Sequence, residues 1–166
     1  MSFERCIAFT LDKIEKEWSS DRKTRWGIDQ RFHPDVDLDT LTRDGAIQIY
    51  WEQYWLMIKG NQLPWPVSLA CFDEAAHDGP QDAIKTLQVA LRPKYRGKLD
   101  GDIGPQTLGA LRATETRGLV FEMLSIRWRE LLHRHFNTDG RTQMFGFGNR
   151  LILLALEAGA STAKET

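Results

Sequence analysis

The stretch KGNQLPWPVSLACFDEAAHDGP, residues 59–80, contains the end of one helix, the whole of a second and the start of a third. The glycine and prolines of KGNQLPWP end the first of these, since proline lacks the N–H that a helix interior requires. Pro66 suits the first turn of the next helix, which is predicted to run to about Ala76. HDGP then forms a turn, and Pro80 opens the third helix. Helix follows helix with short connections.

The same pattern continues on both sides of this stretch. Apolar side chains recur at helical spacing in most segments, and no alternating strand pattern exceeds four residues. Residues 19–40 are polar and interrupted by Pro34, which predicts a loop or a small irregular lobe. We therefore predict an all-α domain. Its other helices are expected from Ser2 to Trp18, Thr42 to about Ile58, Pro80 to about Leu91, Pro105 to Leu111, about Arg117 to Phe136, and about Phe147 onward.

The composition of the chain is that of an ordinary globular protein. It has 166 residues, 42% hydrophobic and 27% charged, with a net charge of −1. This balance gives no reason to expect binding to nucleic acid or to an anionic membrane. Cys6 and Cys71 lie among apolar neighbours and are expected to be reduced core residues.

No segment of the sequence predicts insertion into a membrane. The longest apolar run, LILLALEAGA, contains Glu157 and is too short to span a bilayer. The first residues lack a charged segment followed by an apolar one, so no signal peptide is expected. We therefore expect synthesis in the cytoplasm.

Glu15 and Glu17, in IEKEW, are the candidate acids on the first predicted helix. At about 100° per residue, each lies roughly 80° from the centre of the apolar stripe, on opposite sides. Both positions can be half buried, and partial burial raises a carboxyl pKa toward neutral pH, as a general acid requires. Both also suit solvated charges, so helix geometry leaves the choice open.

Four segments occur in an order and spacing typical of one enzyme family. They are IEKEWSSDRKTRWGID, LTRDGAIQIYWEQYW, GNQLPWPVSLACFDEAAHDGP and AIKTLQVALRPKYRGKLDGDIGPQTLGAL. Together they resemble glycoside hydrolase family 108, the N-acetylmuramidases found among phage and prophage endolysins. The resemblance covers roughly residues 3–135. It implies a lysozyme-like helical fold and a catalytic glutamate in a Glu-Gly-Gly-aromatic motif.

The motif resolves the choice between the two glutamates. Its aromatic stands three residues after the acid, which matches Trp18 to Glu15. Lys16 and Glu17 then occupy the two glycine positions, which is a departure from the family pattern. The resemblance thus implies Glu15 as the catalytic acid.

The loop after the motif departs from the family as well. It is shorter here, with Asp21 six and Thr24 nine residues after Glu15. Asp21 and Thr24 are the stand-ins for the loop carboxylate and hydroxyl of the family. They complete the implied catalytic set, and Asp29 is a less favoured second carboxylate.

Five residues are candidates for binding substrate. Trp18 is the aromatic of the motif, and Tyr54 and Trp55 belong to an aromatic stripe that suits either a sugar-binding groove or the core. Asp73 and His77 are four residues apart and share one helix face, although a histidine at a helix end is also a common C-terminal interaction.

The segment KLDGDIGPQTLGAL resembles a sequence motif of peptidoglycan-binding modules. A turn that leads into a helix starting at Pro105 would also explain why these residues occur here. We therefore predict a single domain over residues 1–160, with a catalytic part at about 3–80, a peptidoglycan-binding-like part at about 81–135 and a tail at 161–166. No spacing of histidines and cysteines suggests a metal site, and we expect no cofactor.

The resemblance implies a peptidoglycan hydrolase of endolysin type. It would cleave the β-1,4 bond between N-acetylmuramic acid and N-acetylglucosamine as a monomer, acting on glycan strands after release by a holin or another route. The alternatives are a peptidoglycan-binding protein of the same fold without activity, a lytic transglycosylase that forms 1,6-anhydro products, and a helical accessory protein that neither binds nor cleaves the wall.

Overall fold

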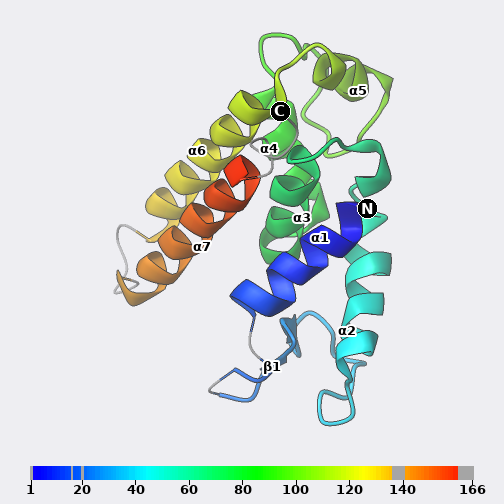
Figure 1. The fold of residues 1–166 in the computed structure, drawn as a ribbon, viewed down its shortest axis with the longest axis vertical. Coiled ribbons are helices and arrows are strands. Elements are labelled where there is room, and N and C mark those ends of the chain that lie inside the picture. The colour runs from blue at the N-terminus through cyan, green and yellow to red at the C-terminus, as the bar shows by residue number, and fades with distance from the viewer. Residues whose placement is uncertain (1, 16, 20, 136–140, 161–166) are drawn as a thin grey trace.

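The computed structural model describes residues 2–15, 17–19, 21–135 and 141–160, and these are mostly helical (Figure 1). The predicted all-α, lysozyme-like helical domain is confirmed. The predicted tail at 161–166 and residue Lys16 lie outside the described residues. The elements are α1 (Ser2–Phe9), η1 (Thr10–Ile14), β1 (Thr24–Arg25), β2 (Ile28–Asp29), α2 (Arg43–Tyr50), η2 (Trp51–Trp55), η3 (Gly60–Gln62), α3 (Val67–Asp78), α4 (Pro80–Ala90), α5 (Pro105–Arg112), α6 (Thr116–His135) and α7 (Arg141–Ala160).

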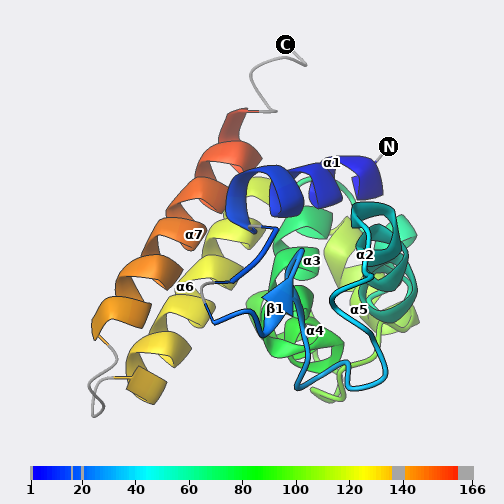
Figure 2. The ribbon, with the colours of Figure 1, turned by 90° about the horizontal axis from the view of Figure 1, so that it is seen from below.

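Helix α3 is the central element of the helical body. Its residues from Val67 to Ala75 are all buried, and it packs against α1, α4 and α6. A surrounded helix must be apolar on all sides or pair its polar groups. Helices α6 and α7 lie side by side along one flank of the molecule (Figures 1 and 2).

The helix starts that rest on proline are confirmed within one residue. Helix α3 begins directly after Pro66, and α4 and α5 begin at Pro80 and Pro105. Helix α7 begins at Arg141, earlier than predicted, because two glycines in FGFG obscure its periodicity. Cys6 and Cys71 are free and buried, as predicted. The division into parts at about residue 80 remains a prediction.

The prediction that the first helix runs to Trp18 is wrong. Helix α1 passes into the π-helical turn η1, which ends at Ile14, where the Glu15 N–H donates to the Thr10 carbonyl at 2.8 Å. A π-helical turn reaches one residue further than an α-helical turn, so the side chains beyond it leave the predicted stripe. A second π-helical turn, η2, continues α2.

The polar segment, for which a loop or a small lobe was predicted at residues 19–40, contains a short antiparallel hairpin. It forms a small lobe at one end of the helical body (Figure 1). Thr24 pairs with Asp29, and Arg25 pairs with Ile28, whose side chain is fully buried. The Arg25 guanidinium also donates to the carbonyls of Leu38 and Asp39. Strands of two residues are too short to produce an alternating pattern in the sequence.

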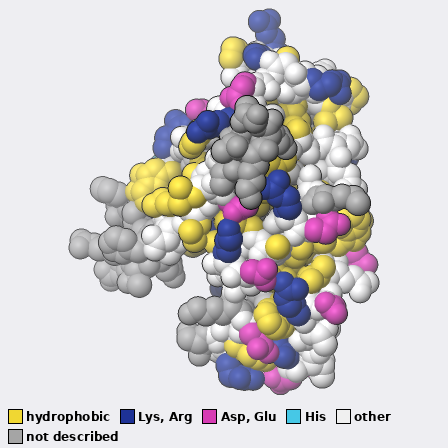
Figure 3. Space-filling view, in the orientation of Figure 1, with side chains coloured by type: hydrophobic (Ala, Val, Ile, Leu, Met, Phe, Trp, Pro, Cys, Tyr) yellow, Lys and Arg dark blue, Asp and Glu magenta, His cyan; other side chains and the backbone are white. Residues whose placement is uncertain are grey.

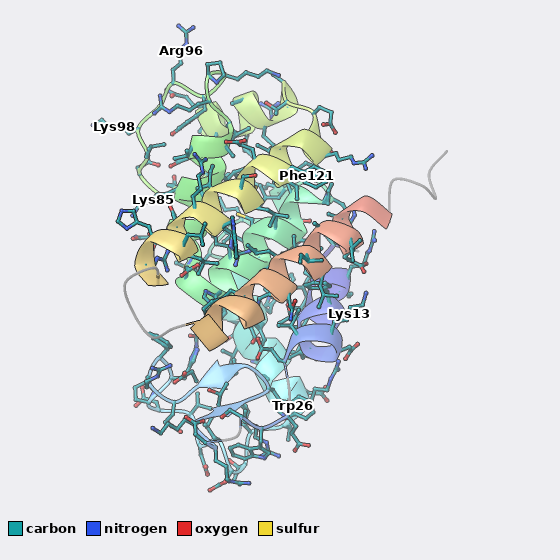
Figure 4. The ribbon with its side chains drawn as sticks, turned by 90° about the vertical axis from the view of Figure 1, so that its left-hand side faces the viewer. Lys13, Trp26, Lys85, Arg96, Lys98 and Phe121 are labelled. Carbon is teal, nitrogen blue, oxygen red and sulfur yellow. The ribbon has the colours of Figure 1, made fainter. Side chains whose placement is uncertain are left out.

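Helix α7 is attached to the first helix at its C-terminal part. Lys13 Nζ donates to Glu157 Oε2 at 2.6 Å, and Lys13 lies close to α7 in Figure 4.

The outer face of α6 and α7 exposes hydrophobic side chains, among them Phe121 and Ile152 (Figure 3). Among the described helices, none is long and apolar enough to cross a membrane.

Glu74 is a buried carboxyl whose charge is poorly compensated. Thr86 Oγ1 donates to Glu74 Oε1 at 2.6 Å, whereas Arg127 Nε lies 3.8 Å from Oε2, too far for a hydrogen bond. Burial outweighs these contacts and raises the pKa of Glu74 to about 8. Glu74 is therefore mostly protonated at neutral pH.

This raised pKa predicts a pH-dependent stability. A carboxyl that binds its proton more tightly in the folded state than in the unfolded chain loses stabilisation as the pH rises between the two pKa values. The ordinary pKa of Glu74 is 4.5 and the folded value is about 8, so the contribution falls across that interval. Glu74→Gln should remove this part of the fall in the free energy of unfolding, measured by urea denaturation between about pH 5 and pH 8. The exposed Glu122→Gln is the matched control, and equal slopes for both variants would contradict the burial of an uncompensated carboxyl.

Candidate active site

A cleft of about 520 Å³ lies between the hairpin lobe and the helical body. Its walls come from distant parts of the chain: the residue after η1, the hairpin and the turn that follows it, η2, the junction of α3 with α4, and α7. The fold therefore assembles this cleft from segments that are remote in the sequence. Polar and aromatic side chains line it, as in sites that bind sugars.

Glu15 lines the cleft and Glu17 does not. The Glu17 side chain is 53% exposed and accepts a hydrogen bond from Arg25 at 3.1 Å, whereas the Glu15 side chain is 24% exposed. Glu15 has an extended backbone because the helix has already ended. The structure thus distinguishes two glutamates that helix geometry left equivalent.

Arg150, on α7, holds the Glu15 carboxyl from the opposite end of the chain. Its Nη1 donates to Glu15 Oε1 at 3.0 Å, and its Nε donates to Asp73 Oδ1 at 3.0 Å. Arg127, on α6, donates from Nη1 to Asp73 Oδ2 at 2.9 Å. Arg150 therefore connects Glu15 in the cleft to Asp73 on the central helix, and Arg127 contacts the other oxygen of Asp73.

Asp73 is fully buried and ionised. Burial alone would raise the pKa of Asp73, but the charges and hydrogen bonds of Arg150 and Arg127 outweigh it and lower the pKa below its ordinary value. Asp73 does not line the cleft. It lies behind Arg150 and supports it, which differs from the predicted contact with substrate.

The hairpin presents Thr24 and Asp29 to the cleft. The two residues pair with each other across the ladder, and the Thr24 side chain helps to lower the pKa of Asp29. Hydrogen bonds from the Arg31 side chain, at 2.7 Å for Nη2 to Oδ2, lower the pKa of Asp29. An ionised carboxylate and a hydroxyl thus lie together on the lobe side of the cleft.

Two aromatic residues line the same cleft. Tyr54 Oη lies 2.8 Å from His33 Nε2, and burial raises the pKa of Tyr54 and lowers the pKa of His33. Phe32 is 74% exposed, and the Arg31 guanidinium lies 5.6 Å from the centre of its ring. An exposed aromatic ring at a cleft provides an apolar face against which a sugar ring can pack.

His77 and Asp78 line the cleft where α3 meets α4. His77 Nδ1 lies 3.2 Å from Asp78 Oδ2, and the His77 ring packs edge-on against Phe147 of α7. Burial opposes ionisation of Asp78, but the contacts with His77 and Arg134 outweigh it and lower the pKa of Asp78 well below its ordinary range. Asp78 is therefore ionised, and its charge is paired with Arg134, whose Nη1 lies 2.7 Å from Asp78 Oδ1.

Three predicted site residues lie elsewhere. Asp21 is exposed in a turn, where its carboxylate accepts hydrogen bonds from Ser19 Oγ and the Lys23 N–H. Trp18 packs beneath the guanidinium of Arg22. Trp55 is 0% exposed and donates from Nε1 to Asn61, so it is a core residue and its predicted contact with substrate is wrong. The aromatic stripe of the second helix places Tyr54, but not Trp55, in the cleft.

Arg150, Arg127 and Phe32 were missed by sequence reasoning. A signal exists for Arg127, because it lies four residues after Met123 and four before Leu131, both of which are buried on the same stripe. A charged residue on an apolar stripe indicates a buried ion pair. The partner of Arg150 is 135 positions away, and no local pattern identifies it.

Comparisons with known proteins agree with this fold. The family model for glycosyl hydrolase 108 matches residues 17–79, so the resemblance predicted from the sequence is confirmed over those residues. The solved structure described as "Structure of Brucella abortus SagA" is similar, with 24% sequence identity and a TM-score of 0.79 over 96% of this chain and 94% of that chain. No curated protein matches the chain.

The family match begins at Glu17, two positions after Glu15. It includes Thr24 and Asp29 but neither Glu15 nor Arg150. The position of Glu15 in the cleft is therefore an observation separate from the match.

Within the described residues, no group of three or more histidine, cysteine, aspartate or glutamate side chains is placed to hold a metal ion.

Gly27 provides a test of the packing around Glu15. Its φ is +78°, and a Cβ at this position would lie 2.1 Å from Tyr50 Oη and 2.9 Å from Glu15 Cγ. Gly27→Ala should therefore displace the Glu15 side chain, lower the free energy of unfolding by at least about 2 kcal/mol and reduce activity. Chemical denaturation and an activity assay measure both effects.

Gly109→Ala is the matched control, because a Cβ there meets no atom within 4 Å and the residue lies within α5. It should change the stability by less than about 1 kcal/mol and leave activity intact. A Gly27→Ala variant as stable and active as this control would contradict the packing described.

Proposed function

We propose that the protein is a peptidoglycan hydrolase that cleaves the β-1,4 bond between N-acetylmuramic acid and N-acetylglucosamine, with Glu15 as the general acid. The observation that carries the proposal is that Glu15 lines the same cleft as Asp29 and Thr24 of the hairpin. Glycoside hydrolysis requires two carboxyl groups beside the glycosidic bond, and this cleft supplies Glu15 and Asp29. The family match supports the same reaction class.

In the proposed mechanism, protonated Glu15 donates to the glycosidic oxygen as the bond to the sugar breaks. Asp29, kept ionised by Arg31, faces the developing positive charge of the sugar, and Asp29 and Thr24 together orient the attacking water. Asp29 takes the role that was predicted for Asp21, because Asp21 is exposed in a turn outside the cleft.

The remaining cleft residues are suited to binding a glycan strand. Phe32 offers an exposed aromatic face for a sugar ring, and Tyr54 provides an aromatic edge with a hydroxyl. His77 and Gln53 add groups that can hydrogen-bond to sugar hydroxyls or acetamido groups. In this proposal the glycan lies along the cleft from Phe32 to His77, and the protein acts at the cell wall as an endolysin after release from the cytoplasm.

The direct test compares Glu15→Gln with Glu17→Gln. Glutamine has the size of glutamate but cannot donate an acidic proton, so Glu15→Gln should lower the rate of fragment release from purified peptidoglycan by at least about 100-fold. Glu17→Gln is the matched control and should retain the rate of the wild type. Mass spectrometry of the soluble fragments should show reducing N-acetylmuramic acid ends.

Other outcomes would replace the proposal with a specific alternative. Fragments with 1,6-anhydro ends would identify a lytic transglycosylase. Binding of the wall without fragments would identify a binding protein of the same fold, and neither binding nor fragments would identify an accessory protein. Loss of activity in Glu17→Gln alone would transfer the role of the acid to Glu17.

A further inference from the structure

Arg150 contacts two carboxylates through two different nitrogens of one guanidinium. Nη1 donates to Glu15 Oε1 and Nε donates to Asp73 Oδ1, each at 3.0 Å, and the Arg150 side chain is only 12% exposed. These contacts use one oxygen of the Glu15 carboxyl. The planar group can hold both partners at once because its donors point in fixed directions.

If Asp73 released Arg150, it would lose one of its two cationic partners, and one of its buried oxygens would lose a hydrogen bond. Its second oxygen accepts from Arg127, whose side chain is 3% exposed. Each of three helices supplies one member of this buried set: α3 supplies Asp73, α6 supplies Arg127 and α7 supplies Arg150. Breaking a buried ion pair by removing one partner costs more than breaking an exposed one, so this anchor is rigid.

We propose that Arg150 is a positioning residue for the acid: anchored by Asp73 and Arg127, it holds Glu15 Oε1 so that the proton lies on Oε2 and faces the glycosidic oxygen. This inference rests on the proposed function. When the reaction occurs, the Glu15 Oε2–H bond breaks, the proton moves to the leaving glycosidic oxygen, and the electron pair of that bond remains on the carboxylate. The bond from the sugar carbon to that oxygen breaks with its electron pair remaining on the oxygen; water then forms a bond to the sugar carbon and gives its proton to a carboxylate of the cleft.

The cation has a second effect on this step. Arg150 faces the negative charge that appears on Glu15 as the proton leaves, so it stabilises the transition state more than the starting state. Arg150 lies on α7, outside the residues that match the family model. The C-terminal helix therefore completes a site whose other walls lie within the first 80 residues.

The test uses Arg150→Lys and Arg150→Met in the full-length protein, with the exposed Arg129→Met of α6 as the matched control. Lysine keeps a positive charge beside Asp73 but cannot bridge both carboxylates as the guanidinium does. The initial rate of fragment release is measured over a range of concentrations of solubilised peptidoglycan, and circular dichroism and thermal melting establish that each variant is folded.

Folded Arg150→Lys should lose about tenfold or more in kcat while KM changes less than about threefold, because the acid is misplaced but the cleft is intact. Arg150→Met should lose at least as much in kcat, since it removes both the charge and the donors, and Arg129→Met should match the wild type. If Arg150→Met does not fold, the kcat of Arg150→Lys alone tests whether Arg150 positions the acid.

A merely structural role would lower the melting temperature but leave the kcat of the folded variant unchanged, and that result overturns the inference. A wild-type rate in folded Arg150→Lys also overturns it while the proposed hydrolase activity stands. An absence of fragments from the wild type overturns the proposed function itself, and the role of Arg150 with it.

Discussion

Asp73 is a fully buried carboxylate, and the two guanidinium groups that compensate its charge belong to the two helices that pack against α3 on the flank of the molecule. An isolated charge in this position would be very unfavourable, and removal of one partner from such a buried pair costs about 3–5 kcal/mol. The requirement for both arginines fixes α6 and α7 relative to α3. Because Arg150 also reaches Glu15, the same electrostatic requirement determines where the catalytic candidate lies.

Local backbone geometry provides the second constraint on the cleft. The π-helical turn η1 ends the first helix at Ile14, and η2 carries Gln53 and Tyr54 into the cleft. Such turns shift the side chains that follow them relative to an α-helix and are frequent at functional sites. Next to Glu15, Gly27 of the hairpin has a positive φ and leaves space that the Glu15 side chain occupies. These features bring Glu15 and the hairpin together in one cleft.

Much of the fold could be predicted because its boundaries are marked by single residues. Proline at positions 66, 80 and 105 marked helix starts, and Thr42, where the second helix was predicted to begin, caps it by accepting from the Gly45 N–H. The end of the first helix could not be predicted, since Trp18 continues the apolar spacing and a π-helical turn leaves no compositional signal. Periodicity left Glu15 and Glu17 equivalent, and only the family motif separated them. The partnership of Arg150 with Glu15 depends on long-range packing that spacing does not contain.

The central claim is that a glycan strand lies in this cleft with its scissile bond at residue 15. The most direct measurement is a crystal structure of the Glu15→Gln protein with a peptidoglycan oligosaccharide that spans the cleft. The account predicts a glycosidic oxygen within hydrogen-bond distance of the residue 15 amide, a sugar ring against Phe32, and Arg150 still in contact with Asp73. An oligosaccharide bound outside the cleft, or with its glycosidic oxygen beside Glu17, would contradict the account.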